Sequence, residues 1–218
     1  MDFSFLSEYS GFFMQGAKFT LLLAFFTVML GSLMGLLLSL MKLSNNKIFK
    51  SIASIYIEFI RGTPVLVQLY IIYYGLPALG IEFPDMVAAV ITLSINSAAY
   101  VAEIIRAGIN AVDKGQMEAA RSLGMGKSMA MTHIIIPQAF KNILPALGNE
   151  FIVIIKESSI VSVIGIHELM YNANTIRGNL FQPFEPLIVA ALMYFIMTFT
   201  LSKLLGIVER RMKVSDRN

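Results

Sequence analysis

The sequence predicts an all-α membrane protein with about five transmembrane helices, an outside N-terminus and a cytoplasmic C-terminus. Hydrophobic residues make up 56% of the 218 residues and charged residues only 14%, which is far from the composition of a soluble domain. The apolar residues come in long runs, and the lysines and arginines fall between those runs. We therefore expect one transmembrane domain over residues 1–218, in a plasma membrane, and no nucleic-acid partner.

Five apolar runs are long enough, or nearly so, to cross a hydrocarbon core, which takes roughly 20 helical residues. They lie at about 19–41, 52–76, 86–107, 134–155 and 187–208. With the N-terminus outside, twelve of the 17 lysines and arginines fall in the predicted cytoplasmic segments. The positive-inside rule thus indicates an odd number of crossings. The stretch 156–186 is predicted to be an outer loop with a short helix at about 166–173.

The inner loop at 111–133, between the third and fourth runs, contains a predicted amphipathic helix. Asp113 can cap this helix, in which Met117, Ala120, Leu123 and Gly124 recur at spacings of three and four. Small residues such as Ala119, Ala120 and Gly124 would let another protein's side chains approach the backbone closely. From the pattern alone, an interfacial helix resting on lipid headgroups is an equal alternative.

Sequence motifs in and around this loop resemble those of a known family. EAARSLG at 118–124, followed after nine residues by IIIP at 134–137, resembles the EAA signature of ABC importer permeases, with Ile136 in place of the usual leucine. EFIRGTP at 58–64, AYVAEIIRAGI at 99–109, GQ at 115–116 and PQA at 137–139 are similar to the polar amino acid branch. The resemblance extends over about 16–206.

The resemblance implies a transport subunit and not an enzyme. It implies a second permease chain, identical or similar, two ATPase subunits inside, a substrate-binding protein outside and an amino acid substrate. ATP and Mg²⁺ would bind to the ATPase partners, so no cofactor is expected in this chain. The residues expected to couple to the ATPases are Gly115, Glu118, Ala119, Ala120, Ser122, Leu123 and Gly124.

Two other site classes are not supported by the sequence. Gly126-Lys127-Ser128 resembles the end of a phosphate-binding loop, but the required first glycine would be residue 121, which is arginine. The chain has no cysteine, and its two histidines are isolated, so neither a metal site nor a catalytic thiol is expected.

Polar side chains inside the apolar runs are candidates for the substrate path, because such groups are costly in lipid. In the second run, Glu58 and Arg61 are three residues apart and can pair. Pro64 removes a backbone hydrogen bond, so the helix can open or kink at Gly62-Thr63-Pro64. Broken helices present backbone groups to substrates in transporters, which makes Thr63 a candidate, although a packing kink is an equal alternative.

The third run carries Ser94, Asn96 and Ser97 near its middle, and these are the next substrate candidates. Asn96, Tyr100 and Glu103 share a helix face that should line the pore, unless these groups form hydrogen bonds between helices instead. Glu103 is three residues from Arg106 and is expected to form a structural ion pair with it.

Glu150 in the fourth run has no basic residue one turn away in that run. We expect it to line the substrate cavity and to pair with an α-ammonium group or a cationic side chain, which favours basic amino acids such as arginine, lysine or histidine. A salt bridge to Lys141 or Lys156 is the competing interpretation. An alternative function for the chain is an ion-coupled carrier or channel with Glu58, Glu103 and Glu150 as ion sites, and a membrane scaffold is a third.

Overall fold

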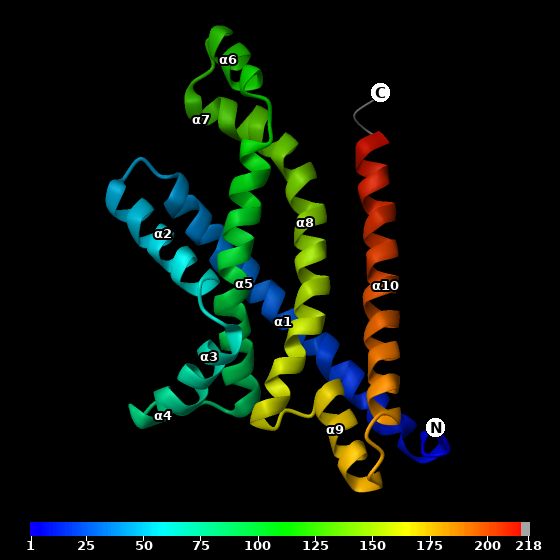
Figure 1. The fold of residues 1–218 in the computed structure, drawn as a ribbon. Helices are drawn as coiled ribbons and strands as arrows, with labels where there is room; N and C mark the ends of the chain where they lie inside the picture. Colours follow the sequence, from blue (N-terminus) through cyan, green and yellow to red (C-terminus); the bar gives the residue numbers. More distant parts are fainter. Residues whose placement is uncertain (215–218) are drawn as a thin grey trace.

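The computed structural model describes residues 1–214, and all regular structure in these residues is helical (Figure 1). The predicted all-α class is therefore confirmed. The α-helices are α1 (Leu6–Leu43), α2 (Lys47–Arg61), α3 (Val65–Tyr70), α4 (Leu76–Ala78), α5 (Asp85–Asn110), α6 (Lys114–Ser122), α7 (Lys127–Ala130), α8 (Ile136–Glu157), α9 (Leu169–Leu180) and α10 (Glu185–Val214). Two π-helical segments (Ile71–Gly75 and Met131–Ile135) and one 3-10 segment (Ser158–Ile164) join them.

The long helices form one bundle. Helix α5 packs on α8, α8 packs on α10, and α1 crosses the bundle obliquely against α5. In Figure 1, α6, α7 and the end of α10 lie at the top, while the N-terminus, α4 and α9 lie at the bottom. The N-terminus therefore lies at the end of the bundle opposite to α6, α7 and the end of α10.

Three helices, α1, α5 and α10, are long and apolar enough to cross a membrane, and a fourth span is possible if α2 and the following helices count as one. Helix α8 has 22 residues, a length of about 33 Å. Its sequence is less uniformly apolar and includes Lys141 and Glu150. Five crossings therefore remain a prediction. Helix α1 also begins at Leu6, well before the predicted start at 19.

The second predicted span, at 52–76, is broken in its middle. Helix α2 ends at Arg61, and the chain bends by 105° before continuing as α3 to α4. Proline has no N–H and disfavours helical geometry in the residue before it, so Thr63-Pro64 ends the helix here. The predicted opening at Gly62-Thr63-Pro64 is confirmed, although the break is much sharper than a kink.

Glycines allow α1 to approach α5 closely. A Cβ atom at Gly31 would lie 2.9 Å from Cβ of Ser97, and one at Gly35 would lie 2.7 Å from Cβ of Val101. Both distances are too short for carbon atoms that are not bonded to each other. The GxxxG pattern in the first apolar run is therefore a packing seam between helices.

Helix α9 is tied to both α1 and α10 by Glu168, which is fully buried and accepts hydrogen bonds from Thr20 and Tyr194. The Glu168 carboxylate caps α9 by accepting hydrogen bonds from the backbone N–H groups of Met170 (2.9 Å) and Tyr171 (2.7 Å). It also accepts one from the Tyr194 hydroxyl at 2.6 Å. The cap explains why α9 begins at Leu169, three residues after the predicted start.

Candidate functional site

Two of the predicted substrate residues, Ser97 and Glu150, meet inside the bundle. The Ser97 hydroxyl of α5 donates a hydrogen bond to Oε1 of Glu150 in α8 at 2.9 Å. Ser97 is fully buried and Glu150 is only 7% exposed. The described residues give two ion pairs, Lys42–Glu103 and Arg106–Glu103, and Glu150 takes part in neither. A hydroxyl thus orients this carboxyl group, and neither of these ion pairs includes it.

Ser94 lies on the same side of α5 but faces α1. Its hydroxyl donates to the Thr27 carbonyl oxygen at 3.3 Å, and the hydroxyl of Thr27 is itself buried without a hydrogen-bond partner. Ser94 therefore joins helices α5 and α1, whereas Ser97 one turn later joins α5 and α8.

Asn96 and Thr63 are linked through Gln68, a residue that the sequence did not single out. The Asn96 amide donates to Oε1 of Gln68 at 3.1 Å. Nε2 of Gln68 lies 2.9 Å from the Thr63 hydroxyl and 3.1 Å from the Thr63 carbonyl oxygen. Asn96 and Gln68 are both buried. Asn96 thus contacts the broken span on one side of α5, and its neighbour Ser97 contacts Glu150 on another.

The predicted ion pair between Glu58 and Arg61 is not formed. Both residues are exposed, and the Arg61 guanidinium lies over the ring of Tyr100 at 5.3 Å from its centroid. Asn96 and Tyr100 therefore contact the two halves of the broken span. These contacts between helices are the alternative to a pore-lining face.

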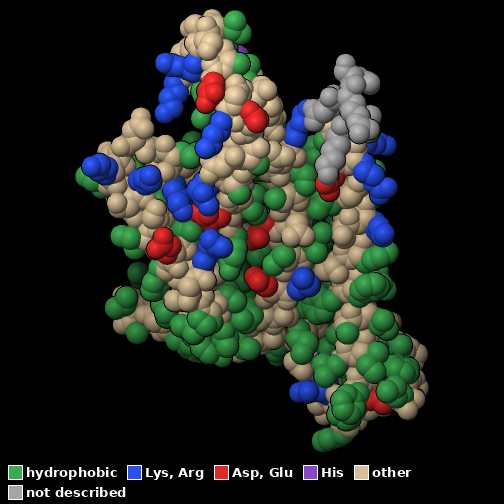
Figure 2. All heavy atoms as spheres, turned by 45° about the horizontal axis from the view of Figure 1, so that its top comes forward, with side chains coloured by type: hydrophobic (Ala, Val, Ile, Leu, Met, Phe, Trp, Pro, Cys, Tyr) green, Lys and Arg blue, Asp and Glu red, His purple; other side chains and the backbone are tan. Residues whose placement is uncertain are grey.

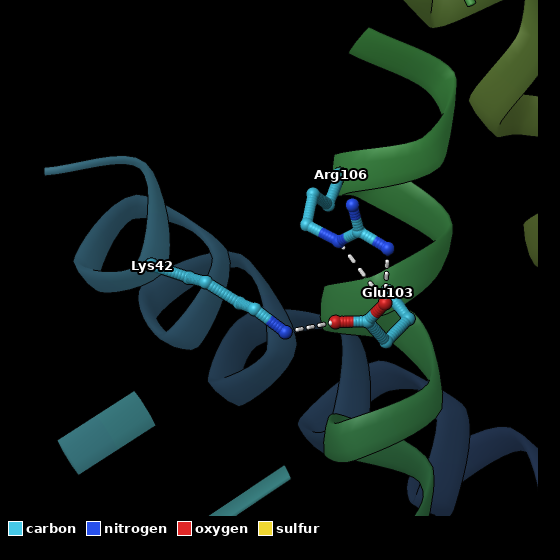
Figure 3. Close-up of polar contacts among 3 residues, drawn as sticks. All are labelled: Lys42, Glu103 and Arg106. Carbon is cyan, nitrogen blue, oxygen red and sulfur yellow. Dashed lines mark hydrogen bonds and ion pairs between the residues drawn. The ribbon is translucent and has the colours of Figure 1, made fainter. Parts of the chain in front are cut away.

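The predicted Glu103–Arg106 pair is confirmed and includes a third partner, Lys42 (Figure 3). One carboxylate oxygen of Glu103 accepts from Lys42 at 2.5 Å, and the other accepts from Nε and Nη2 of Arg106 at 3.0 and 2.7 Å. Lys42 lies in the last turn of α1. The three charges therefore fix the end of α1 to α5.

A cavity of about 470 Å³ opens between α5, α8 and α10 toward the end that carries α6 and α7. Its lining includes Gly108, Lys141, Asn142 and Glu209. None of the predicted substrate residues lines this cavity. In the described part of the chain, no group of three or more histidine, aspartate or glutamate side chains is placed to hold a metal ion.

The predicted amphipathic helix after Asp113 is present as α6, and Asp113 caps it. The Asp113 carboxylate accepts a hydrogen bond from the Gly115 N–H at 2.7 Å. The Ser122 hydroxyl donates one to the Glu118 carbonyl oxygen at 3.0 Å. Glu118 and Ser122 are exposed. Lysine and arginine side chains gather mostly toward this end of the molecule, with acidic groups among them (Figure 2).

The tip after α6 is the most prominent apolar feature of this end. Leu123 is 85% exposed, and Gly124 adopts a positive φ of 86° in open space. Ala119 is exposed, but Ala120 is only 5% exposed. The predicted small-residue surface is therefore corrected: Ala120 packs against its own chain and is not available to a partner.

Comparison with known proteins identifies the family. The model of the binding-protein-dependent transport system inner membrane component matches residues 16–214. This chain belongs to that family. The chain is therefore a multi-pass inner-membrane transport component, and the resemblance to ABC importer permeases of the polar amino acid type is confirmed.

The relatives of this permease cover nearly the whole chain. It is 44% identical over 217 residues to the arginine transport system permease protein ArtQ of Bacillus subtilis, covering 99% of both chains. It is 45% identical over 205 residues to the putative glutamine transport system permease protein GlnP of Rickettsia bellii, covering 94% of both.

Solved structures have the same fold. A crystal structure of an amino acid ABC transporter with histidines contains a chain 57% identical to this permease, with a TM-score of 0.94 over 97% of this chain and 99% of that one. A chain of the inward-facing MetNI methionine ABC transporter has a TM-score of 0.80 at 17% identity, over 97% of this chain and 99% of that one. The second likeness concerns the fold alone.

Proposed function

We propose that this chain is the transmembrane subunit of an ATP-driven amino acid importer that works by alternating access. Its partners are two ATPase subunits, a second permease chain and an outer substrate-binding protein. The chain crosses the membrane five times, with its N-terminus outside and α6 in the cytoplasm. Family membership and the capped, exposed helix α6 support this assignment. Motion and binding are this chain's contribution, and ATP hydrolysis belongs to its partners.

In this proposal the coupling contact is made by the outward side of α6 and its tip. Leu123 projects into solvent, and Gly124 beside it has no Cβ to obstruct a partner. An exposed leucine next to a glycine suits insertion into a cleft on another protein. Closure of the ATPase pair would then move α6 and, through the loop 111–133, the ends of α5 and α8.

The substrate that the site supports best is a basic amino acid. The observation that carries this assignment is the buried Glu150 carboxylate, which is held by Ser97 and belongs to neither ion pair. A buried carboxylate is stable when a cation accompanies it. An arginine permease and a transporter solved with histidines are among the relatives, while a glutamine permease is equally similar. Glu150 therefore pairs with the cationic side chain or the α-ammonium group.

A test of the tip at Leu123 separates the importer from an ion-coupled carrier, an alternative that the family assignment does not favour. Leu123→Asp should abolish co-purification of the ATPases and ATP-dependent uptake in reconstituted vesicles. Phe181→Asp is the matched control, because Phe181 is 92% exposed near the opposite end and should leave co-purification unchanged. Uptake that persists in Leu123→Asp and follows an ion gradient would contradict the importer.

A further inference from the structure

The break in the second span leaves carbonyl groups that need hydrogen-bond donors. The last carbonyls of a helix have no partner within it, and water cannot reach such groups inside a bundle. After α2, the Gly62 N–H donates to the Glu58 carbonyl at 2.9 Å. The Thr63 hydroxyl lies 3.0 Å from the Phe59 carbonyl oxygen. The Ile60 carbonyl receives only a long contact of 3.4 Å from the same hydroxyl, and the Thr63 carbonyl still needs a donor.

The side chain of Gln68 satisfies both. Its Nε2 lies 2.8 Å from the Ile60 oxygen in the last turn of α2 and 3.1 Å from the Thr63 oxygen in the break. Gln68 is in the first helix after the break and is only 6% exposed. Its amide therefore joins the end of α2 to the start of α3. A methionine of similar size would take this donor from both carbonyls and leave Ile60 with only the long contact from the Thr63 hydroxyl.

The other end of the same amide reaches α5. Oε1 of Gln68 accepts from Nδ2 of Asn96 at 3.1 Å, and the next residue of α5, Ser97, holds Glu150. Successive residues of a helix point about 100° apart. A movement of α5 that shifts the position of Glu150 would therefore also shift Asn96 and Gln68, and with them the angle of the break in the second span.

We infer that Gln68 is a positioning residue for transport: it fixes the angle of the broken span and connects that angle to the Glu150 site through Asn96. This inference rests on the proposed transport function. It adds a residue that touches no substrate and acts through Thr63 and Asn96. The angle between α2 and α3 is then important for transport, and the hydrogen bonds of one buried amide hold it.

Distances across the bend test this inference directly. The chain has no cysteine, so Ile55→Cys and Leu79→Cys give unique spin-label sites on either side of the break, and both positions are exposed, at 69% and 77%. Pulsed electron paramagnetic resonance measures the distance between the two labels in the assembled complex. Labelled chains are diluted with unlabelled ones so that only distances within one chain contribute. Uptake per assembled complex is measured in parallel.

In Gln68→Met we expect the distance distribution between the labels to shift or broaden and uptake per complex to fall at least about tenfold, the effect of losing more than one buried hydrogen bond. Gln15→Met, at an exposed glutamine of α1, is the control and should change neither. An unchanged distribution, or a loss of uptake no larger than the loss of assembled complex, would overturn the inference.

Asn96→Leu is the second variant, because leucine has a similar size and has no group that can donate to Gln68. It should change the same distance distribution even if Gln68→Met does not assemble, and an unchanged distribution would refute the connection to α5. A wild-type complex that imports no amino acid would refute the proposed function, while the label distances would still decide the role of Gln68.

Discussion

The Ser97 hydroxyl donates to Glu150 at 2.9 Å across the interface of α5 and α8. A hydrogen bond to a charged group contributes about 1.5–3 kcal/mol, so this contact fixes where the carboxylate points. Ser97→Ala should raise the KM for uptake about tenfold and change kcat less. The double variant Ser97→Ala/Glu150→Gln should be no worse than Glu150→Gln alone. Additive losses would mean that Ser97 acts independently of Glu150.

The ion triad of Lys42, Glu103 and Arg106 predicts unequal effects of removing its members. Glu103→Gln leaves two cations without their shared partner and should cost about 1–2 kcal/mol, which lowers the Tm by about 2–4 °C per kcal/mol. Lys42→Met should cost less than about 1 kcal/mol, because Arg106 remains paired. Thermal unfolding in detergent measures both. Lys50→Met, at an exposed lysine, is the control, and an effect of Lys42→Met equal to that of Glu103→Gln would contradict the account.

The glycine seam predicts that added methyl groups will separate α1 from α5. Gly35→Ala places a Cβ atom 2.7 Å from the Val101 Cβ and should cost about 1–3 kcal/mol through overpacking. Gly11→Ala has no atom within 4 Å of the new Cβ and should be neutral or slightly stabilising. Thermal unfolding of the two variants provides the comparison. Equal Tm values would show that the α1–α5 contact can relax freely.

The buried cap at Glu168 predicts a local effect on α9. Glu168→Ala removes hydrogen bonds from Met170, Tyr171 and Tyr194 and should cost about 1–3 kcal/mol. Amide hydrogen exchange should rise mainly in residues 169–180. Glu82→Ala, at an exposed outer residue, should leave exchange there unchanged. Exchange that rises equally throughout the bundle would mean that Glu168 supports the whole fold.

Local features predicted the helices well. The apolar runs predicted most ends of α5, α8 and α10 to within a few residues. The Asp113 cap correctly predicted the start of α6. The proline correctly predicted that the second span opens. Its 105° bend could not be predicted, because the angle depends on contacts formed only in the folded chain, among them the packing of α3 against α5 and the Gln68–Asn96 hydrogen bond.

Contacts between distant residues could not be predicted in the same way. The sequence indicates only a cytoplasmic charge at Lys42, yet this side chain binds Glu103, 61 residues later in the chain. Arg61 lies over Tyr100 instead of pairing with Glu58, since the rotation of α2 turns it toward α5. Gln68 cannot be identified from the sequence, because a single amide in an apolar run has no periodic signal. Its role appears only once the break leaves carbonyl groups beside it.

The most direct test of the account is uptake by Glu150→Gln in the reconstituted importer, measured for arginine, histidine and glutamine. We expect arginine uptake to fall by at least about tenfold, as the loss of a buried ionic contact implies, and glutamine uptake to fall less. Glu8→Gln, at an exposed residue of α1, should transport all three normally. Unchanged uptake of all three amino acids by Glu150→Gln would contradict the central claim that this carboxylate lines the substrate path.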